Sequence, residues 1–477
     1  MPSFLYQQSA QQLARQIASQ EVRSLDAVLA CLEQIERHDQ TLHAYITVCR
    51  EAAIAAAEAA DAAVQQGDRL GSLHGVPIAI KDLTATAGIR TTYGSPLHAN
   101  HVPSYDDLCV ARLKAAGAII LGKTNTPEFG MGAHSANVLC GPTATPYDPS
   151  RSSGGSSGGS AVATAAGMAY LAQGTDMGGS VRTPASFCGV VGLRPSAGRI
   201  PRIPKALPSE TLVTDGVLAR SVEDAALMLS AMAGYDPRDP ASLAASGWEM
   251  PEFSEALCDR LTGKVRLGYS TDLGVAVVDA AVRDVFEGAI AQLAFVCDCI
   301  APEHPDCRSA KATFETLRAG ILYQTHHHYL ATQADQLSST VRWNIERGKD
   351  VTAQAFLAAE VERGRLYQSF LKFFESYDVL ATVSASVPPF PHTQAEVLEI
   401  NGTPLDNIID YLLITYTLTL TGLPVVSIPC GYTATGLPIG MQLVGKPQGE
   451  AELLQFAYLL QERLGFRHQW QGEKVEG

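Results

Sequence analysis

The sequence is poor in charge and has no long apolar run. Charged residues make up 18% of the 477 residues, while hydrophobic residues reach 46%. An average globular protein carries about 25% charged residues, so this balance is typical of a folded chain with little room for long disordered tails. Because no apolar stretch approaches the roughly 18 residues of a transmembrane helix, we expect no membrane span and no membrane partner.

Positive charge and closely spaced cysteines are also scarce. Lys and Arg total 35 against 49 Asp and Glu, and the resulting net charge of −14 disfavours a protein whose main ligand is nucleic acid or an anionic membrane surface. The ten cysteines are scattered along the chain, and the N-terminus lacks the basic start and apolar stretch of a signal peptide. The sequence therefore predicts free thiols in a reducing, cytoplasmic setting.

Two kinds of apolar pattern alternate along the chain. Strand patterns are expected at 76–81, 118–121, 170–176, 190–193, 265–269, 379–382, 425–428 and 439–444. Helical patterns are expected at 24–38, with Ser24 as N-cap, and at 51–65, 107–116, 160–166, 222–233, 282–295, 353–375 and 450–464. This alternation predicts an α/β fold with helices on both faces of a sheet. The region 236–261, rich in Pro, Ser and Asp, is expected to be a surface excursion.

Glycine exceeds its usual share in one window only. Eleven of the 41 glycines fall within 154–198, where Ser156 and Ser180 each follow closely on glycine. A flexible linker is disfavoured because helix and strand patterns surround and interrupt the window. Glycine permits consecutive backbone N–H groups to converge on a developing oxyanion, since no Cβ obstructs them, and Gly178 and Gly179 fit that need.

A serine hydroxyl needs a base to become a nucleophile at neutral pH, and two arrangements compete. Residues 154–158 match the G-x-S-x-G elbow of α/β-hydrolase esterases, which uses a later acid and a later histidine. The elbow requires a strand before it, whereas 147–151 are expected to form a turn. The other base is Lys81, at the end of an apolar strand, where burial would lower the pKa of its amine. A lysine that reaches the surface from the strand end is the competing interpretation.

Several segments together resemble the amidase signature family of serine amidohydrolases. The matching segments are 74–82, 122–128, 154–161, 174–182, 187–195, 422–424 and 436–445. The glycine-serine block followed by Gly-Thr-Asp-x-Gly-Gly-Ser is highly specific, and the similarity covers nearly the whole chain. The resemblance implies one large domain with a central mixed β-sheet, in which a helical region of residues 1–70 packs on a catalytic domain of residues 71–477.

The resemblance also implies a Ser-cisSer-Lys triad that needs no metal or organic cofactor. Ser180 would be the nucleophile, Ser156 the bridging serine on a cis peptide bond, and Lys81 the terminal base. The oxyanion would be held by the backbone N–H groups of Met177, Gly178, Gly179 and Ser180.

More modest roles are expected for neighbouring residues. Asp176 and Arg182 flank the nucleophile and are expected to form structural hydrogen bonds. Further contacts to substrate are expected from Gly130, Met131, Gly155 and Ser157. No metal site is expected at His326, His327 and His328, because consecutive helical residues point about 100° apart. Buried packing is expected for Cys297, Cys299 and Cys307.

The resemblance implies hydrolysis of C–N bonds through a seryl acyl-enzyme. Met131 and Met177 offer adaptable apolar contacts, so we expect a small, uncharged, partly apolar aryl or alkyl amide or a carbamate, with esters as a further class. The expected partner is this small molecule, together with a second copy of the chain, since dimers are common in the family.

A different function within the family is the glutaminase subunit of the tRNA-dependent amidotransferase. Those subunits carry an Asp ten residues before the C-terminal Gly-Leu-Pro, where it holds the amino group of glutamine. Leu412 stands at that position here, and an apolar residue cannot pair with an ammonium group. Glutamine hydrolysis is therefore kept as the alternative function.

Overall fold

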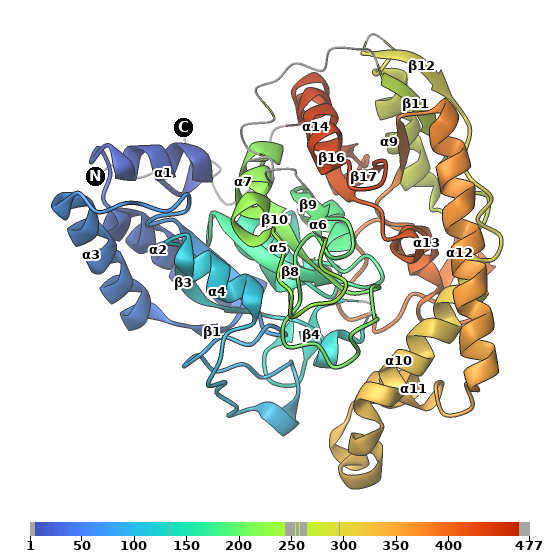
Figure 1. Ribbon diagram of the computed structural model, residues 1–477, viewed down its shortest axis with the longest axis horizontal. Coiled ribbons are helices and arrows are strands. Elements are labelled where there is room, and N and C mark those ends of the chain that lie inside the picture. Colours follow the sequence, from blue (N-terminus) through green and yellow to red (C-terminus); the bar gives the residue numbers. More distant parts are fainter. Residues whose placement is uncertain are drawn as a thin grey trace.

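The computed structural model describes residues 5–132, 134–243, 253, 257, 265–294 and 296–466. Its centre is an eleven-stranded sheet in the order β1-β3-β2-β8-β10-β9-β16-β17-β13-β11-β12 (Figure 1). The strands are β1 Tyr45–Val48, β2 Pro77–Lys81, β3 Ile119–Thr124, β8 Leu171–Asp176, β9 Val191–Arg194, β10 Thr214–Ala219, β11 Val265–Tyr269, β12 Cys297–Ala301, β13 Val379–Val383, β16 Val425–Tyr432 and β17 Pro438–Val444. Parallel pairs near both ends of the sheet enclose antiparallel pairs, which confirms a mixed sheet.

Helices cover both faces of this sheet, as the α/β prediction requires. They are α1 Ala10–Ala18, α2 Ser24–Leu42, α3 Arg50–Gln66, α4 Leu108–Ala115, α5 Gly158–Ala165, α6 Arg182–Cys188, α7 Val222–Met232, α9 Ala280–Ala291, α10 Ala310–Thr332, α11 Ser339–Glu346, α12 Ala353–Ser376, α13 Leu413–Thr421 and α14 Glu450–Leu464. Helix α5 packs against α6, and α7 packs against α4 and α14. None of the helices within the described residues is long and apolar enough to cross a membrane.

Local sequence explains where several of these helices start and stop. The alanine-rich α3 ends at Gly67, which adopts the left-handed conformation (φ 74°) that glycine tolerates best. Ser221 caps α7 by accepting a hydrogen bond from the Asp224 N–H. The expected cap of α2 is one residue off, because Arg23 occupies the N-cap and Ser24 already lies inside the helix.

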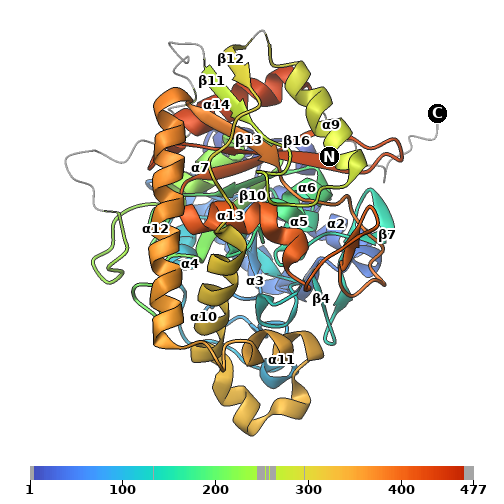
Figure 2. The same cartoon turned by 90° about the vertical axis from the view of Figure 1, so that its right-hand side faces the viewer.

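The N-terminal helices lie against the main body of the fold. Helices α2 and α3 pack against each other and against β3, and α1 contacts α7. Figure 1 shows this group in blue at one side of the molecule, opposite the long helices α10 and α12. Figure 2 shows α10 and α12 alongside each other, and α13 packs against both.

Three short hairpins lie outside the central sheet: β4 Ala136–Asn137 with β5 Gly141–Pro142, β6 Ala144–Thr145 with β7 Asp148–Ser152, and β14 Glu399–Ile400 with β15 Thr403–Pro404. The turn expected at 147–151 is therefore wrong, because most of it forms strand β7. Of the expected excursion at 236–261, residues 236–243 form turns and bends, and Phe253 is buried. Apart from Phe253 and Leu257, residues 244–261 lie outside the described residues.

Candidate active site

Lys81 ends strand β2 with its side chain fully buried. Its Nζ donates hydrogen bonds to Ser156 Oγ at 2.7 Å, Ser157 Oγ at 2.9 Å and Thr175 Oγ1 at 3.0 Å. All three acceptors are neutral hydroxyls. Burial lowers the pKa of Lys81 to about 7, even though the charges of Asp176 and Asp215 favour the cation. A substantial fraction of this amine is therefore neutral at physiological pH and able to accept a proton.

Ser156 lies in the loop between β7 and α5, and the Gly155–Ser156 peptide bond is cis. The Ser135 hydroxyl donates to the carbonyl oxygen of Ser156 at 3.1 Å and so fixes the following peptide group, between Ser156 and Ser157. The Ser156 side chain thereby meets the Lys81 amine on one side and lines a cavity on the other.

Ser180 occupies the turn between β8 and α6. The Ser157 N–H donates to the Ser180 carbonyl oxygen at 3.0 Å, which ties the two serine-bearing loops together. Ser180 lines the same cavity as Ser156, and its hydroxyl makes no hydrogen bond within the described residues. The structure therefore brings Lys81, Ser156 and Ser180 to one place and leaves the Ser180 hydroxyl open to a ligand.

The turn before Ser180 presents backbone N–H groups in close succession. Gly179 has φ 109°, and a Cβ there would lie 2.4 Å from Thr415 Oγ1, so a side chain is excluded twice over. Its N–H donates to Asp176 Oδ1 at 3.0 Å, which corrects the expectation that Gly179 faces an oxyanion. In the part of the chain that the structure describes, the N–H groups of Met177, Gly178 and Ser180 have no acceptor.

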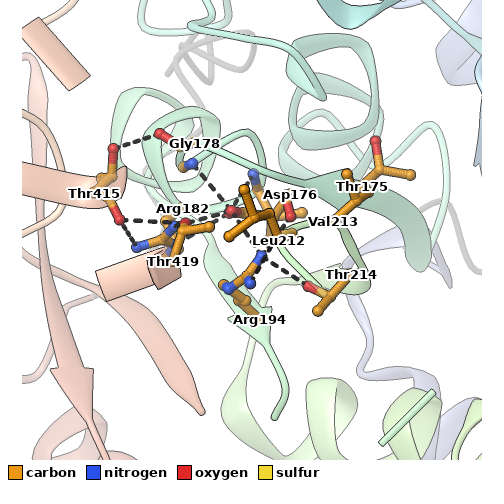
Figure 3. A network of polar contacts seen from close by, with 12 residues as sticks. Thr175, Asp176, Gly178, Arg182, Arg194, Leu212, Val213, Thr214, Thr415 and Thr419 are labelled. Atoms are coloured by element: carbon orange, nitrogen blue, oxygen red, sulfur yellow. Dashed lines mark hydrogen bonds and ion pairs between the residues drawn. The ribbon is translucent and has the colours of Figure 1, made fainter. Parts of the chain in front are cut away.

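A buried ionic network holds this turn, as Figure 3 shows. Asp176 accepts from Arg182 at 2.9 and 3.1 Å and lies 3.3 Å from Arg194. Burial alone would raise the pKa of Asp176, but the two guanidinium groups hold it well below its usual range. Arg182 also donates to the Thr415 carbonyl oxygen at 2.9 Å, and the Thr415 hydroxyl donates to the Gly178 carbonyl oxygen at 2.6 Å. Helix α13 thus braces the Ser180 turn.

The cavity in front of the serines has a volume of about 350 Å³. Its wall is largely apolar and includes Leu83, Phe129, Met177, Phe314, Ile321 and Leu412. Gly130 and Met131 line it as expected, and a Cβ on Gly130 would lie only 2.8 Å from Leu83 Cδ1. The cavity therefore suits a small ligand with apolar parts.

Two residues that were expected to contact substrate do not line the cavity. Ser157 is fully buried, does not line the cavity, and its hydroxyl instead accepts from Lys81 and donates to the Thr175 carbonyl oxygen at 3.2 Å. Gly155 is also away from the cavity wall, because it packs against the backbone of His134. Both residues support the loop rather than face the cavity.

The elbow arrangement fits the geometry poorly, although a strand does precede it. Strand β7 belongs to a two-stranded hairpin outside the central sheet. The central serine of the motif, Ser156, has the Lys81 amine as its hydrogen-bond partner within the described residues, and no histidine. Lysine is thus the base that the structure offers.

The remaining sequence-based expectations have mixed outcomes. Cys297 and Cys307 are buried, but Cys299 is exposed on the edge strand β12, where an irregularity in the pairing with β11 between Cys297 and Cys299 interrupts the alternation of faces. His326 lines the cavity, where burial lowers its pKa to about 4. Sequence reasoning missed Thr175, Arg194, Arg318 and Thr415. No motif marks Arg318, which reaches the cavity from helix α10 far along the chain.

Comparisons with known proteins show the family of the chain. A family model described as Amidase matches residues 26–454. A glutamyl-tRNA(Gln) amidotransferase subunit from Moorella thermoacetica is 36% identical, with 96% of this chain and 97% of that protein covered. A solved bacterial aryl acylamidase of the amidase signature family has a TM-score of 0.86 at 26% identity, covering 96% of each chain. The peptide amidase from Stenotrophomonas maltophilia has a TM-score of 0.80 at 27% identity, covering 96% of this chain and 97% of that chain.

Proposed function

The chain belongs to the amidase signature family of hydrolases, and on that premise we propose that it works as a stand-alone amidase on a small, partly apolar amide. The observation that carries this proposal is the buried Lys81 amine at 2.7 Å from Ser156 Oγ, beside a cavity that Ser180 also lines. A neutral amine, a bridging hydroxyl and an unengaged hydroxyl are the parts that a proton relay to a nucleophile needs.

In the proposed reaction, neutral Lys81 accepts the proton of Ser156 while Ser156 accepts the proton of Ser180. The Ser180 oxygen attacks the amide carbonyl carbon, and the N–H groups of Met177 and Gly178 bind the resulting oxyanion. The relayed proton passes to the leaving nitrogen, the C–N bond breaks, and an acyl-Ser180 ester remains. Water then attacks this ester with the same relay as base, which releases the acid and restores the Ser180 hydroxyl.

The apolar wall supports aryl and alkyl amides as the substrate class, with carbamates and esters as further substrates. A serine-directed fluorophosphonate should add its mass to the peptide that contains Ser180. Ser180→Ala should lose hydrolysis of an aryl amide panel, while Ser376→Ala, an exposed serine at the end of α12, should keep it. Labelling of Ser156 or Ser157 instead would refute the assignment of Ser180 as nucleophile.

A second function, glutaminase activity within a tRNA-dependent amidotransferase, is favoured by the sequence identity to the Moorella amidotransferase protein over nearly the full chain. Against it stands Leu412, which puts an apolar side chain in the cavity wall where the amino group of glutamine needs an acid. We expect the purified chain to hydrolyse an aryl amide but not glutamine, and Leu412→Asp to raise glutamine hydrolysis. Efficient hydrolysis of glutamine by the unaltered chain, with other proteins co-purifying, would favour the second function.

A further inference from the structure

One cation of the cavity wall has no counter-ion among the residues that the structure describes. Arg318 lies on α10 and lines the cavity together with Ser156 and Ser180. One guanidinium nitrogen donates to Asn344 Oδ1 on α11 at 2.5 Å. Within the residues that the structure describes, this is its one hydrogen bond, and it forms no ion pair.

The other charged residues of the wall are compensated. Arg202 lies 3.8 Å from Glu210 and 3.5 Å from Asp215, and Lys205 lies 3.3 Å from Asp239. The Glu210 carboxylate also accepts the Val213 N–H at 2.8 Å. Uncompensated positive charge in the wall is therefore concentrated at Arg318.

The nearest acid on the same helix is already occupied. Glu315, one turn before Arg318, accepts from Arg347 at 3.1 Å and from Asn407 at 2.7 Å. The Tyr416 hydroxyl would favour the Arg318 cation only if it were ionised. It is buried without a hydrogen-bond partner in the described part of the chain, and burial raises its pKa, so it stays neutral. Burial lowers the pKa of Arg318 to about 10, which leaves the guanidinium charged at neutral pH.

Arg318 is half-buried, and a charge that is drawn out of water without a counter-ion is costly to a fold. A charged group of this kind in a cavity wall is a candidate for ligand binding. We propose that Arg318 binds a carboxylate of the substrate, so that the amide cleaved at Ser180 carries a carboxylate in its acyl part or its leaving group. The planar guanidinium fork matches the two oxygens of a carboxylate. This inference rests on the proposed function and replaces the expectation of an uncharged substrate.

Two matched substrate pairs test the inference. N-(4-nitrophenyl)succinamate and its terminal carboxamide differ by charge in the acyl part, while 4-acetamidobenzoate and 4-acetamidobenzamide differ by charge in the leaving group. The enzyme should prefer the carboxylate member of one pair by about 30-fold in kcat/KM. Arg318→Met should bring that ratio close to one while the neutral member keeps its rate within about threefold, and Arg318→Lys should retain part of the preference. Arg342→Met, which removes an exposed arginine on α11, should change nothing.

Equal rates within both pairs, or an Arg318→Met variant that slows charged and neutral members alike, would overturn the inference. Its failure can be distinguished from failure of the proposed function, because the latter shows as absence of fluorophosphonate labelling at Ser180. Calorimetric titration of Ser180→Ala with the succinamate and its carboxamide gives a test independent of turnover. The succinamate should bind more tightly than its carboxamide, and the Arg318→Met substitution should abolish this difference. Equal affinities for the two compounds in the presence of Arg318 would contradict the proposal.

Discussion

Two buried lysines lie near the ends of neighbouring parallel strands, but only one of their amines contacts a residue of the cavity wall. Lys81 ends β2, and Lys123 is the penultimate residue of β3, paired in register with Ile80. Both side chains are fully buried, and burial lowers the pKa of Lys81 to about 7 and that of Lys123 to about 8. The two amines are thus nearly alike in their tendency to lose a proton.

They differ in what they face. Lys123 Nζ donates to the Thr84 carbonyl oxygen and to the hydroxyls of Thr86 and Thr91, none of which lines the cavity, and the charge of Asp82 favours its cation. Lys81 instead reaches a serine on the cavity wall. A depressed pKa therefore accompanies burial in general, and chemistry requires in addition a path from the amine to a ligand.

The largest expected effect separates the two lysines directly. Lys81→Met should reduce kcat/KM for an aryl amide by about 10⁴-fold, because the relay loses its base. Its circular dichroism spectrum and cooperative thermal unfolding should be retained. Activity within tenfold of the unaltered enzyme would contradict the role of Lys81 as base.

The second effect concerns Asp176, the buried acid that holds the turn before Ser180. Asp176→Asn should lower the free energy of unfolding by about 3–5 kcal/mol in urea denaturation, since Arg182 and Arg194 would lose their shared buried counter-ion. Asp406→Asn, which breaks an ion pair at an 81% exposed carboxylate, should cost less than about 1 kcal/mol. Equal losses in the two variants would show that the buried network does not hold the Ser180 turn.

The third effect is the pH dependence of hydrolysis. Lys81 acts as base in its neutral form, so kcat/KM should rise with pH to a plateau, with an apparent pKa of about 7. Below that pKa the rate should fall about tenfold per pH unit, because the protonated amine cannot accept a proton. A stopped assay with a pH-insensitive aryl amide measures this, and a flat profile from about pH 5 to about pH 9 would exclude a titrating base.

The smallest effect on activity is expected from the second lysine. Lys123→Met should leave kcat/KM within about threefold, because Lys123 has no contact with the cavity. It should lower the free energy of unfolding by about 1–3 kcal/mol, since the threonine oxygens around it lose their donor. A large loss of hydrolysis with unchanged stability would remove the distinction between the two lysines.

The sequence predicts a helix or strand well where the spacing of its apolar residues agrees with the residues that typically begin or end such an element. The strand at 265–269 and the helix at 450–464 have the observed bounds, and Gly67 ends α3 as expected. Helix α10 is missed because its apolar residues face α11, α12, α13 and the cavity at once, which blurs a single amphipathic face. Strand β7 is missed because Asp148 and Pro149 are typical turn residues, and a two-residue partner strand suffices for the pairing.

The residues of the candidate site were likewise predictable only in part. Lys81, Ser156 and Ser180 lie in segments with strong local patterns, so their proximity could be anticipated from the family resemblance. Ser157 could not be distinguished from a ligand contact, because its direction depends on the loop conformation beside the cis bond. Arg318 could not be anticipated, because it approaches the cavity from a helix that only tertiary packing brings there.

The cavity draws its two sides from distant parts of the chain. Ser156 and Ser180 come from loops that adjoin β8, α5 and α6, with Lys81 of β2 behind Ser156. Phe314, Arg318 and Leu412 come instead from α10 and the short helix Asp410–Leu412. Substitutions on α10 can therefore retune which molecules are accepted while the sheet that carries the reacting groups stays untouched. Such a division lets one scaffold diversify by exchange of a few helical side chains, and it marks α10 as the place to redesign selectivity.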